Sequence, residues 1–362
     1  MSLLTHKPNA EAAIERLRAL YARRAGDRIF AAFEVPSPAL AEFKRSHAEG
    51  ICGYPDPAER FRFWDRLLAE RAALEDDSVP SAYLSEFDQG LYAGVLGAEV
   101  RFNCTPETGW ISSMVAPLLA DWADVGKLRL DSGHEWFRRY ERQLGLFVNG
   151  ARGRFGVSHF ILIDGLNFAF ELLGATETYL AMRERPEDLR RAVELGFQVN
   201  AEIQRRFFAA GPELAGGTCG FGVQWLPGRI VAESVDPFHM TSVEDFEAWG
   251  RGNCERIMAE FDGGVTHIHG NGRHLVEAVC SIQGLKAVML GDDKGFLPAV
   301  DELPELRRRA GDMPLTAGVE FADFERRLGK HQLPGGVLYL VRGAASAEAA
   351  NRCMEKVRAY RA

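Results

Sequence analysis

Val265-Thr-His-Ile-His-Gly-Asn-Gly272 begins as an apolar, β-branched run and stops abruptly in glycines, a pattern typical of a buried strand that ends in a turn. Side chains alternate between the two faces of a strand, so Val265, His267 and His269 share one face. Three more strand-like runs follow, each separated from the next by a helical pattern, at residues 285–290, 315–319 and 336–341. Regular alternation of this kind predicts a parallel sheet with helical crossovers.

The same alternation extends toward the N-terminus. Four earlier strands are expected at residues 29–35, 78–84, 156–163 and within 216–225. Eight strands in 362 residues predict a single (β/α)8 barrel domain over residues 1–362, with residues 1–28 as an N-terminal helical extension. Residues 103–131 are expected to form a long irregular loop. The main alternative is a doubly wound open sheet, but no Gly-x-Gly-x-x-Gly sequence follows the first predicted strand.

The composition excludes several classes of protein. A hydrophobic share of 46% and a charged share of 26% are those of a globular protein, and a net charge of -8 argues against a nucleic-acid partner. No apolar run reaches membrane-spanning length, so no membrane association is expected. The six cysteines show no CxxC spacing, which predicts reduced thiols in a cytoplasmic protein.

In a barrel, the chemistry takes place where the strands end. The residues at these predicted ends are Glu34, Asp164, Gln224, Trp225, His267, His269, Asn271, Asp292, Asp293, Glu320 and Arg342. Some of them also fit simpler roles. Asp164 precedes a glycine and suits a helix cap, Asp292-Asp293 suits a solvated turn, and Trp225 suits a lid on the barrel as well as a platform for substrate.

The two histidines on one strand face point to metal binding. A His-x-His pair supplies two ligands for zinc, and a carboxylate from a neighbouring strand can supply the third. Glu320 is the predicted third ligand, because residues 315–319 should bring it to a strand end on the same face. An alternative stays open, in which His267 and His269 form hydrogen bonds with a substrate or with each other.

Three segments resemble the uroporphyrinogen decarboxylase-like superfamily of barrels. They are Asp76-Asp77-Ser78-Val79-Pro80, Asp236-Pro-Phe-His-Met-Thr-Ser-Val-Glu-Asp-Phe246 and His267-Ile-His-Gly-Asn-Gly272. The resemblance spans roughly residue 31 to the C-terminus. The superfamily contains uroporphyrinogen decarboxylases and methyltransferases that depend on a corrinoid or a thiol, so the resemblance implies a barrel enzyme of one of these two kinds.

Decarboxylases of this superfamily hold the substrate carboxylates with an N-terminal Arg-Gln-Ala-Gly-Arg segment. The corresponding residues here are Phe33-Glu-Val-Pro-Ser37, which contain an acid and no arginine, and an acid cannot pair with a propionate. Asp77 corresponds to the aspartate that contacts the pyrrole N–H groups, and Asp236 stands in the place of a serine. A late histidine of the decarboxylases is absent from Leu340-Val-Arg-Gly-Ala344.

Methyltransferases of the superfamily bind zinc through a His-x-Cys pair and a later cysteine. His267-Ile-His269 takes the place of the pair, and Arg342-Gly-Ala-Ala-Ser346 lacks the later cysteine. The resemblance thus implies a zinc site with harder ligands. It also implies catalytic roles for Asp77, Asp236 and His269, and a set of substrate-binding residues: Glu34, Trp225, His239, Asn271 and Arg342.

The sequence therefore predicts methyl-group transfer on a small organic substrate, with zinc and without an organic cofactor. A corrinoid protein is an expected partner, and a homodimer is an expected assembly. Two alternatives remain: decarboxylation of a carboxylated tetrapyrrole or another acid, and a barrel that binds a ligand without catalysis. A polar, titratable set of residues at the strand ends would speak against the last alternative.

Overall fold

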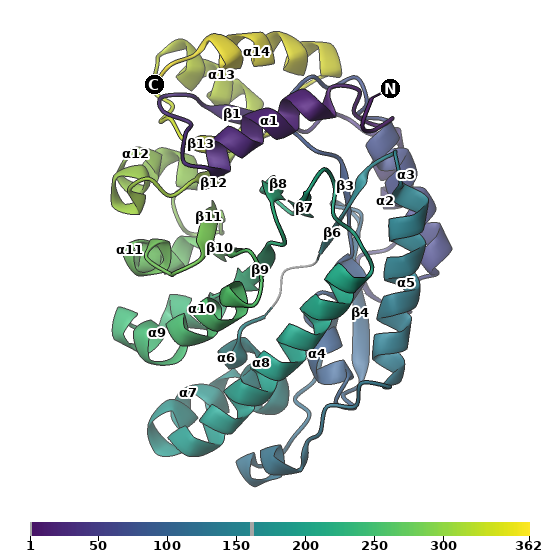
Figure 1. The fold of residues 1–362 in the computed structure, drawn as a ribbon, viewed down its shortest axis with the longest axis vertical. Coiled ribbons are helices and arrows are strands. Elements are labelled where there is room, and N and C mark those ends of the chain that lie inside the picture. The colour runs from purple at the N-terminus through teal and green to yellow at the C-terminus, as the bar shows by residue number, and fades with distance from the viewer. Residues whose placement is uncertain (1, 160–162) are drawn as a thin grey trace.

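The structure, a computed structural model, describes residues 2–159 and 163–362. Its largest sheet contains six parallel strands in the order β1-β13-β12-β11-β10-β9 (Figure 1). Their bounds are β1 Phe30–Phe33, β9 Val231–Ser234, β10 Gly264–Ile268, β11 Leu285–Leu290, β12 Leu315–Glu320 and β13 Val337–Arg342. The predicted alternation of parallel strands and helices is confirmed over the C-terminal half of the chain.

A second sheet contains four strands in the order β3-β6-β7-β8. They are β3 Ser81–Tyr83, β6 Gly156–His159, β7 Gly217–Gly220 and β8 Gln224–Pro227. The first three are parallel, and β8 runs antiparallel to β7. The Asp77 N–H donates a hydrogen bond to the Ala31 carbonyl at 2.9 Å, which joins the segment before β3 to β1 of the larger sheet.

The strand predicted within residues 216–225 is β7, which pairs parallel to β6, but the same segment also contains the start of β8, its antiparallel partner. The strand beside β10 is β9, and it was missed because its segment was expected to be a loop. The cause is a polar residue in β9. Glu233 is buried there and accepts hydrogen bonds from the Asn200 amide at 3.1 and 3.2 Å. A charged side chain in a four-residue strand removes the apolar pattern by which short strands are recognised.

The prediction of an irregular loop over residues 103–131 was also wrong in its first part. β4 (Val100–Thr105) and β5 (Trp110–Val115) form an antiparallel hairpin, and β2 (Gly50–Cys52) pairs with β4. Phe102, Cys104 and Ile111 from this sheet pack with Phe43 in a small separate core. Alternation of inward and outward residues along β4 is the physical basis of this sheet.

Most helices lie outside the two larger sheets, whereas α1 packs against β8 (Figure 1). They are α1 Ala10–Tyr21, α2 Pro38–Ser46, α3 Pro57–Ala69, α4 Leu91–Gly94, α5 Glu135–Ala151, α6 Gly165–Leu173, α7 Ala175–Glu184, α8 Pro186–Ala209, α9 Val243–Trp249, α10 Arg251–Ala259, α11 Val276–Cys280, α12 Ala299–Ala310, α13 Phe321–Gly329 and α14 Ala347–Ala359. Local sequence fixes several starts. Ser242 and Asp245 form the expected capping box of α9, and Pro186 occupies the first turn of α8.

Residues of the strands divide between two cores. Ile268 and Val288 belong to the outer core, between the sheets and the helices, whereas Val265 and Ala287 belong to an inner core. The inner core also contains α1 and the β7–β8 hairpin. A Cβ added at Gly222, in the hairpin turn, would lie 2.8 Å from the Met289 sulfur, so the turn lies directly against β11. The segment from Leu4 to Ala25, within the expected N-terminal extension, thus contributes side chains to the inner core.

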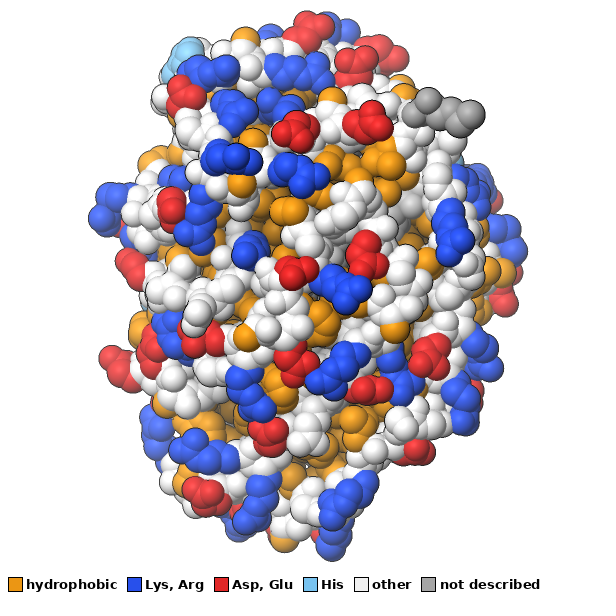
Figure 2. All heavy atoms as spheres, in the orientation of Figure 1, with side chains coloured by type: hydrophobic (Ala, Val, Ile, Leu, Met, Phe, Trp, Pro, Cys, Tyr) orange, Lys and Arg blue, Asp and Glu red, His pale blue; other side chains and the backbone are white. Residues whose placement is uncertain are grey.

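The surface mixes charges of both signs. On the face shown in Figure 2, basic and acidic side chains are interspersed, with apolar side chains between them. No helix among the described residues combines the length and the apolar character needed to cross a membrane.

Candidate metal centre and active site

Three side chains that carry metal-ligand atoms converge beyond the C-terminal end of β10. Asp236 belongs to the 3₁₀ helix η3 (Asp236–Met240) after β9, His267 belongs to β10, and His269 follows it. One ligand atom from each lies within 4.8 Å of the others. Asp236 Oδ1 is 2.8 Å from His267 Nε2 and 3.7 Å from His269 Nε2. The strand positions of both histidines place them on one face, as the sequence predicts.

A second acid orients His269. Asp293, in the loop after β11, accepts a hydrogen bond from His269 Nδ1, with N–O distances of 2.9 and 3.1 Å to its two oxygens. Asp293 also accepts a hydrogen bond from the Gly270 N–H at 2.6 Å. With Nδ1 bound in this way, Nε2 of His269 faces Asp236. A carboxylate behind a histidine is the usual outer partner of a metal-binding imidazole.

His239 completes the group that we call the acid–histidine cluster, namely Asp236, His239, His267, His269 and Asp293. Its ring centroid lies 5.4 Å from that of His269, and its Nδ1 is 3.7 Å from Asp236 Oδ1. His239 packs against Gly272, where an added Cβ would come 2.1 Å from the ring. Gly272 therefore allows the imidazole to lie directly against the backbone.

The atoms of the cluster fit a cation. Asp236 Oδ1 lies between His267 Nε2 and His269 Nε2, at 2.8 and 3.7 Å, and His239 Nε2 is buried beside it without a hydrogen-bond partner among the described residues. Buried polar atoms are almost always satisfied, so such a set calls for a further group. Two imidazoles and a carboxylate are a ligand set used by zinc and other divalent ions. Asp236, His267 and His269 can hold a metal ion.

The local charges support an ionised Asp236 beside a neutral His239. Burial disfavours the charge on Asp236, but the neighbouring histidines outweigh burial and lower its pKa to about 2. Burial lowers the pKa of His239 to about 4, and the nearby histidines add to this shift against the opposing effect of Asp236. The pKa of Asp293 is also lowered, because the Gly270 N–H and His269 outweigh its burial. Neutral imidazole and ionised carboxylate are the forms that bind metals.

A partly protonated acid lies across from this cluster. Asp88 follows β3, and burial raises its pKa to about 7, although the Tyr83 hydroxyl and the charge of His267 lower it. Tyr83 Oη donates a hydrogen bond to Asp88 Oδ2 at 3.1 Å. Asp88 lies close enough to His267 and Asp236 for their charges to act on it. A carboxyl group with a pKa near 7 can accept or release a proton at neutral pH.

Three further acids are buried behind the site. Burial raises the pKa of Asp164 to about 7 and that of Glu171 to about 8, and it raises the pKa of Glu233 well above its usual range. Asp164 is the N-cap of α6, where its Oδ1 accepts a hydrogen bond from the Asn167 N–H at 2.7 Å. The simpler role expected for Asp164 is thus confirmed.

Two of the predicted site residues lie elsewhere. Asp77 precedes β3 and therefore lies at the opposite end of the strands from His269. Its carboxylate binds Arg16 of α1 and the Ala31 N–H, at 2.5 and 3.0 Å, which is a structural role. Trp225 is fully buried in the inner core, and its indole N–H donates to the Leu214 carbonyl at 2.8 Å. It lies away from the strand ends and offers no surface to a substrate.

Glu320, the predicted third ligand, also lies away from the acid–histidine cluster. Glu320 ends β12, two strands from β10, and its carboxylate pairs with Arg342 Nε at 3.2 Å. Arg342 also lies 3.8 Å from Asp292. Glu34 and Asn271 are exposed at the ends of β1 and β10. Glu320, Arg342, Glu34 and Asn271 thus lie at the expected end of the sheet, outside the acid–histidine cluster.

Sequence analysis did not assign roles to Asp88 or Asp293. Asp293 was among the strand-end residues, but nothing in the sequence distinguishes it from its neighbour Asp292. Asp88 lies beyond the expected end of its strand, after the 3₁₀ helix η1 (Ser85–Phe87). The signal for Asp88 is its position after β3, since an acid behind a parallel strand lies at the end where chemistry occurs.

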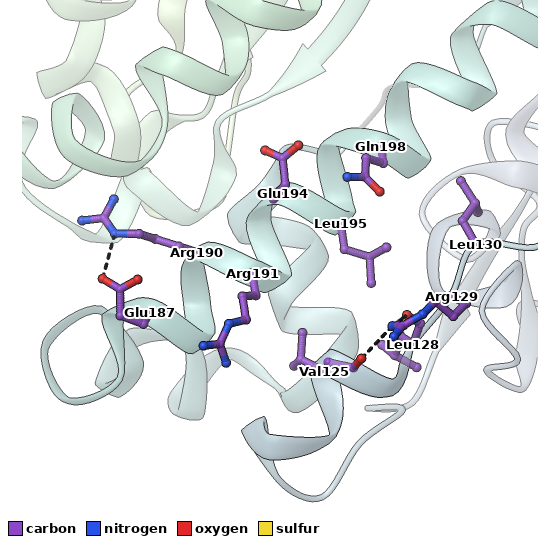
Figure 3. A pocket seen from close by; sticks show the side chains of 11 residues that line it. Val125, Leu128, Arg129, Leu130, Glu187, Arg190, Arg191, Glu194, Leu195 and Gln198 are labelled. Carbon is purple, nitrogen blue, oxygen red and sulfur yellow. Dashed lines mark hydrogen bonds and ion pairs between the residues drawn. The ribbon is translucent and has the colours of Figure 1, made fainter.

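A separate groove lies on the outside of the molecule, between α8 and the 3₁₀ helix η2 (Trp122–Lys127), and has a volume of about 450 Å³ (Figure 3). Most of its charged side chains are paired with an opposite charge. Arg190 lies 3.8 Å from Glu187, Arg191 3.0 Å from Asp188, and Glu194 2.8 Å from Arg256. Arg129 donates to the carbonyls of Gly126 and Leu128, so the groove lacks the converging polar atoms found in the acid–histidine cluster.

Comparisons with known proteins give one informative result. No protein-family model matches the sequence, and no curated protein matches it significantly. A methyltransferase from Methanosarcina mazei has a similar structure, with a TM-score of 0.63 and 12% sequence identity. The match covers 98% of this chain and 99% of the methyltransferase. The chain therefore shares the fold of that methyltransferase over almost its entire length.

Proposed function

We propose that this protein is a metal-dependent enzyme that transfers a methyl group from or to a small organic substrate. The observation that carries the proposal is the convergence of Asp236, His267 and His269, with Asp293 behind His269. The similarity in fold to a methyltransferase supports the same reaction class. Zinc is the proposed metal, because its sites commonly combine imidazole and carboxylate ligands and leave one position open.

Different residues of the site would have different roles in the reaction. Asp236, His267 and His269 would hold the ion, which as a Lewis acid lowers the pKa of a thiol or hydroxyl acceptor bound to it. Asp293 keeps His269 in one orientation. Asp88, with a pKa of about 7, would take up or return the proton exchanged by the acceptor. In the transfer, the acceptor's electron pair forms the new bond to the methyl carbon, and the donor atom leaves with the pair of the old bond.

We also propose that the strands close into one (β/α)8 barrel over residues 1–362. The link from Asp77 to Ala31 between the two sheets supports closure on one side. Residues 160–162, where the third predicted strand ends, lie outside the described residues. A corrinoid protein as methyl donor and a homodimeric assembly remain parts of the proposal that follow from the sequence resemblance.

Decarboxylation is a second candidate, and Asp88 is the observation in its favour. A decarboxylase must return a proton to the carbon that loses carbon dioxide, and an acid with a pKa of about 7 can do so at neutral pH. The segment Phe33–Ser37 offers no arginine for a propionate. We therefore expect no measurable turnover of uroporphyrinogen, and robust turnover would favour decarboxylation over methyl transfer.

Metal analysis of His269→Ala tests the proposal. Wild-type protein reconstituted with zinc should hold about one ion per chain and should transfer a methyl group from methylcobalamin to a small thiol. His269→Ala should lose both properties. His274→Ala is the matched control, because His274 is exposed and bonds only the Thr241 carbonyl at 2.9 Å. Zinc retained by His269→Ala, or a wild-type protein that binds none, would refute the metal site.

A further inference from the structure

Three aromatic rings from distant parts of the chain meet beside the candidate site. Tyr83 ends β3, Trp110 begins β5, and Phe221 lies in the turn of the β7–β8 hairpin. The ring centroids of Tyr83 and Trp110 are 4.9 Å apart, those of Tyr83 and Phe221 are 5.2 Å apart, and those of Trp110 and Phe221 are 5.0 Å apart. We call this group the aromatic wall.

The wall combines a buried anchor with two accessible rings. Tyr83 is only 2% exposed, whereas Phe221 is 42% exposed and Trp110 is partly exposed. The exposure of Phe221 is unusual for its hairpin, in which Val223 and Trp225 are fully buried. The Trp110 indole N–H has no hydrogen-bond partner among the described residues, so it remains available as a donor. These two rings lie side by side and offer a ligand an apolar surface on which it can pack.

The anchor also connects the wall to the acid–histidine cluster. Tyr83 Oη donates to Asp88 Oδ2 at 3.1 Å, and Asp88 responds to the charges of His267 and Asp236. Tyr83 is the last residue of a strand that runs parallel to β6, so its side chain lies at the strand end where the cluster also lies. The aromatic surface thus adjoins the polar groups that would carry out the reaction.

The mutual tilt of the rings favours one kind of ligand. The planes of Trp110 and Phe221 meet at 73°, and those of Tyr83 and Trp110 at 40°. Two rings at such an angle form a corner, in which a flat ring can stack on one face and meet the other edge-on. These are the two preferred geometries of aromatic pairs. A flexible alkyl chain would gain nothing from this arrangement beyond burial.

We propose that the aromatic wall binds an aromatic ring of the substrate and turns its polar substituent toward Asp88 and the acid–histidine cluster. The site would thus select a substituted single-ring aromatic compound over an aliphatic compound of similar size. The Trp110 N–H would donate to an oxygen or nitrogen substituent of that ring. This inference rests on the proposed function for the reaction at the substituent, but ring binding itself can be measured without turnover.

Ligand binding to a leucine variant tests the aromatic wall. Anisole and phenol are the probes, cyclohexanol is the aliphatic probe of similar size, and affinity is measured by saturation-transfer NMR titration. Phe221→Leu keeps an apolar side chain but removes the ring face, and its exposed position should leave folding intact. We expect it to weaken anisole binding about 2–12-fold and to leave cyclohexanol binding unchanged. Phe197→Leu, at a partly exposed phenylalanine of α8 whose ring packs against Arg256, is the matched control and should not change anisole binding.

The outcomes separate this inference from the proposed function. If wild-type protein binds anisole no better than cyclohexanol, or if Phe221→Leu binds it as tightly as wild type, the aromatic wall is not a ligand site. The zinc content of Phe221→Leu should equal that of wild type. If the probes behave as expected but the protein holds no metal and transfers no methyl group, the aromatic wall stands and the proposed reaction fails.

Discussion

His269 has an acidic neighbour at each of its ring nitrogens, and these acids fix the orientation of its ring. Nδ1 bonds Asp293, while Nε2 faces Asp236. The carboxylate of Asp293 fixes the tautomer and makes Nε2 a better ligand. His267 has no such partner, since its Nδ1 is buried without a hydrogen bond among the described residues. The two histidines of one sequence motif therefore have different surroundings.

Asp293→Asn should weaken zinc binding about 10–100-fold, because the amide keeps the shape but loses the charge behind His269. The measurement is a competition titration with a zinc-binding dye. Asp292→Asn is the control, because Asp292 instead accepts a hydrogen bond from the Ala299 N–H at 2.7 Å. In both variants the zinc occupancy should decrease when the pH drops below about 6, since zinc binding needs neutral imidazoles. Equal affinities of the two variants would show that Asp293 does not act on the metal site.

Strands were predicted correctly where their own residues show the pattern. They were predicted less well where the strand depends on contacts with distant parts of the chain. The strands around residues 265–341 are apolar runs, most of them bounded by glycines, and they form as expected. β9 was missed because a buried Glu233 depends on Asn200, which belongs to a distant helix. The hairpin of β7 and β8 was read as one strand, because its turn consists of glycines and apolar residues. Contacts from elsewhere in the chain decide both cases.

The site residues follow the same rule. The face shared by His267 and His269 follows from strand alternation alone. The third ligand does not, because the sequence does not say that η3 bends Asp236 toward β10 while Glu320 pairs with Arg342. The prediction of Asp77 came from the sequence resemblance alone. The expected strand at residues 78–84 already places Asp77 before the strand and Asp88 after it, as β3 does.

Asp77 joins three elements, namely α1 through Arg16, β1 through Ala31, and the start of β3. Asp77→Ala would leave a guanidinium and a buried N–H without their partner, and we expect a loss of about 3–5 kcal/mol in the free energy of unfolding. Urea unfolding measures this loss. Asp312→Ala removes only the exposed pair with Arg23 at 3.0 Å and should cost less than about 1 kcal/mol. The zinc content of both variants should stay at the wild-type level. If folded Asp77→Ala lost its zinc, Asp77 would have a role at the metal site after all.

At the scale of the whole molecule, the described residues include several acids that are buried without a cationic partner, and these acids contribute to the pH dependence of stability. Burial raises the pKa of Glu171 to about 8. In the unfolded chain a glutamate ionises near pH 4, so between about pH 4 and 8 the folded form retains a proton that the unfolded form has lost. The contribution of Glu171 is therefore favourable at low pH and is lost as the pH rises toward 8.

Glu171→Gln should remove this dependence. The amide oxygen can still accept the hydrogen bond from the Ala93 N–H, which measures 2.9 Å in the wild type. We expect the variant to gain about 2 kcal/mol over wild type between pH 5 and pH 9, a value reduced for the partial exposure of the side chain. Glu177→Gln, at an exposed position on α7, should show no such trend. Parallel stability curves for Glu171→Gln and wild type would contradict a raised pKa.

The molecule divides its candidate site between two stretches of chain that do not overlap. The aromatic wall and Asp88 lie between residues 83 and 221, whereas the acid–histidine cluster lies between residues 236 and 293. Mutations in the first stretch can change which substrate fits the site without altering the proposed metal ligands. Mutations in the second stretch can change which metal ion binds without altering the surface that binds the substrate. In evolutionary terms, a duplicated gene of this kind could acquire a new substrate without having to invent a new chemistry.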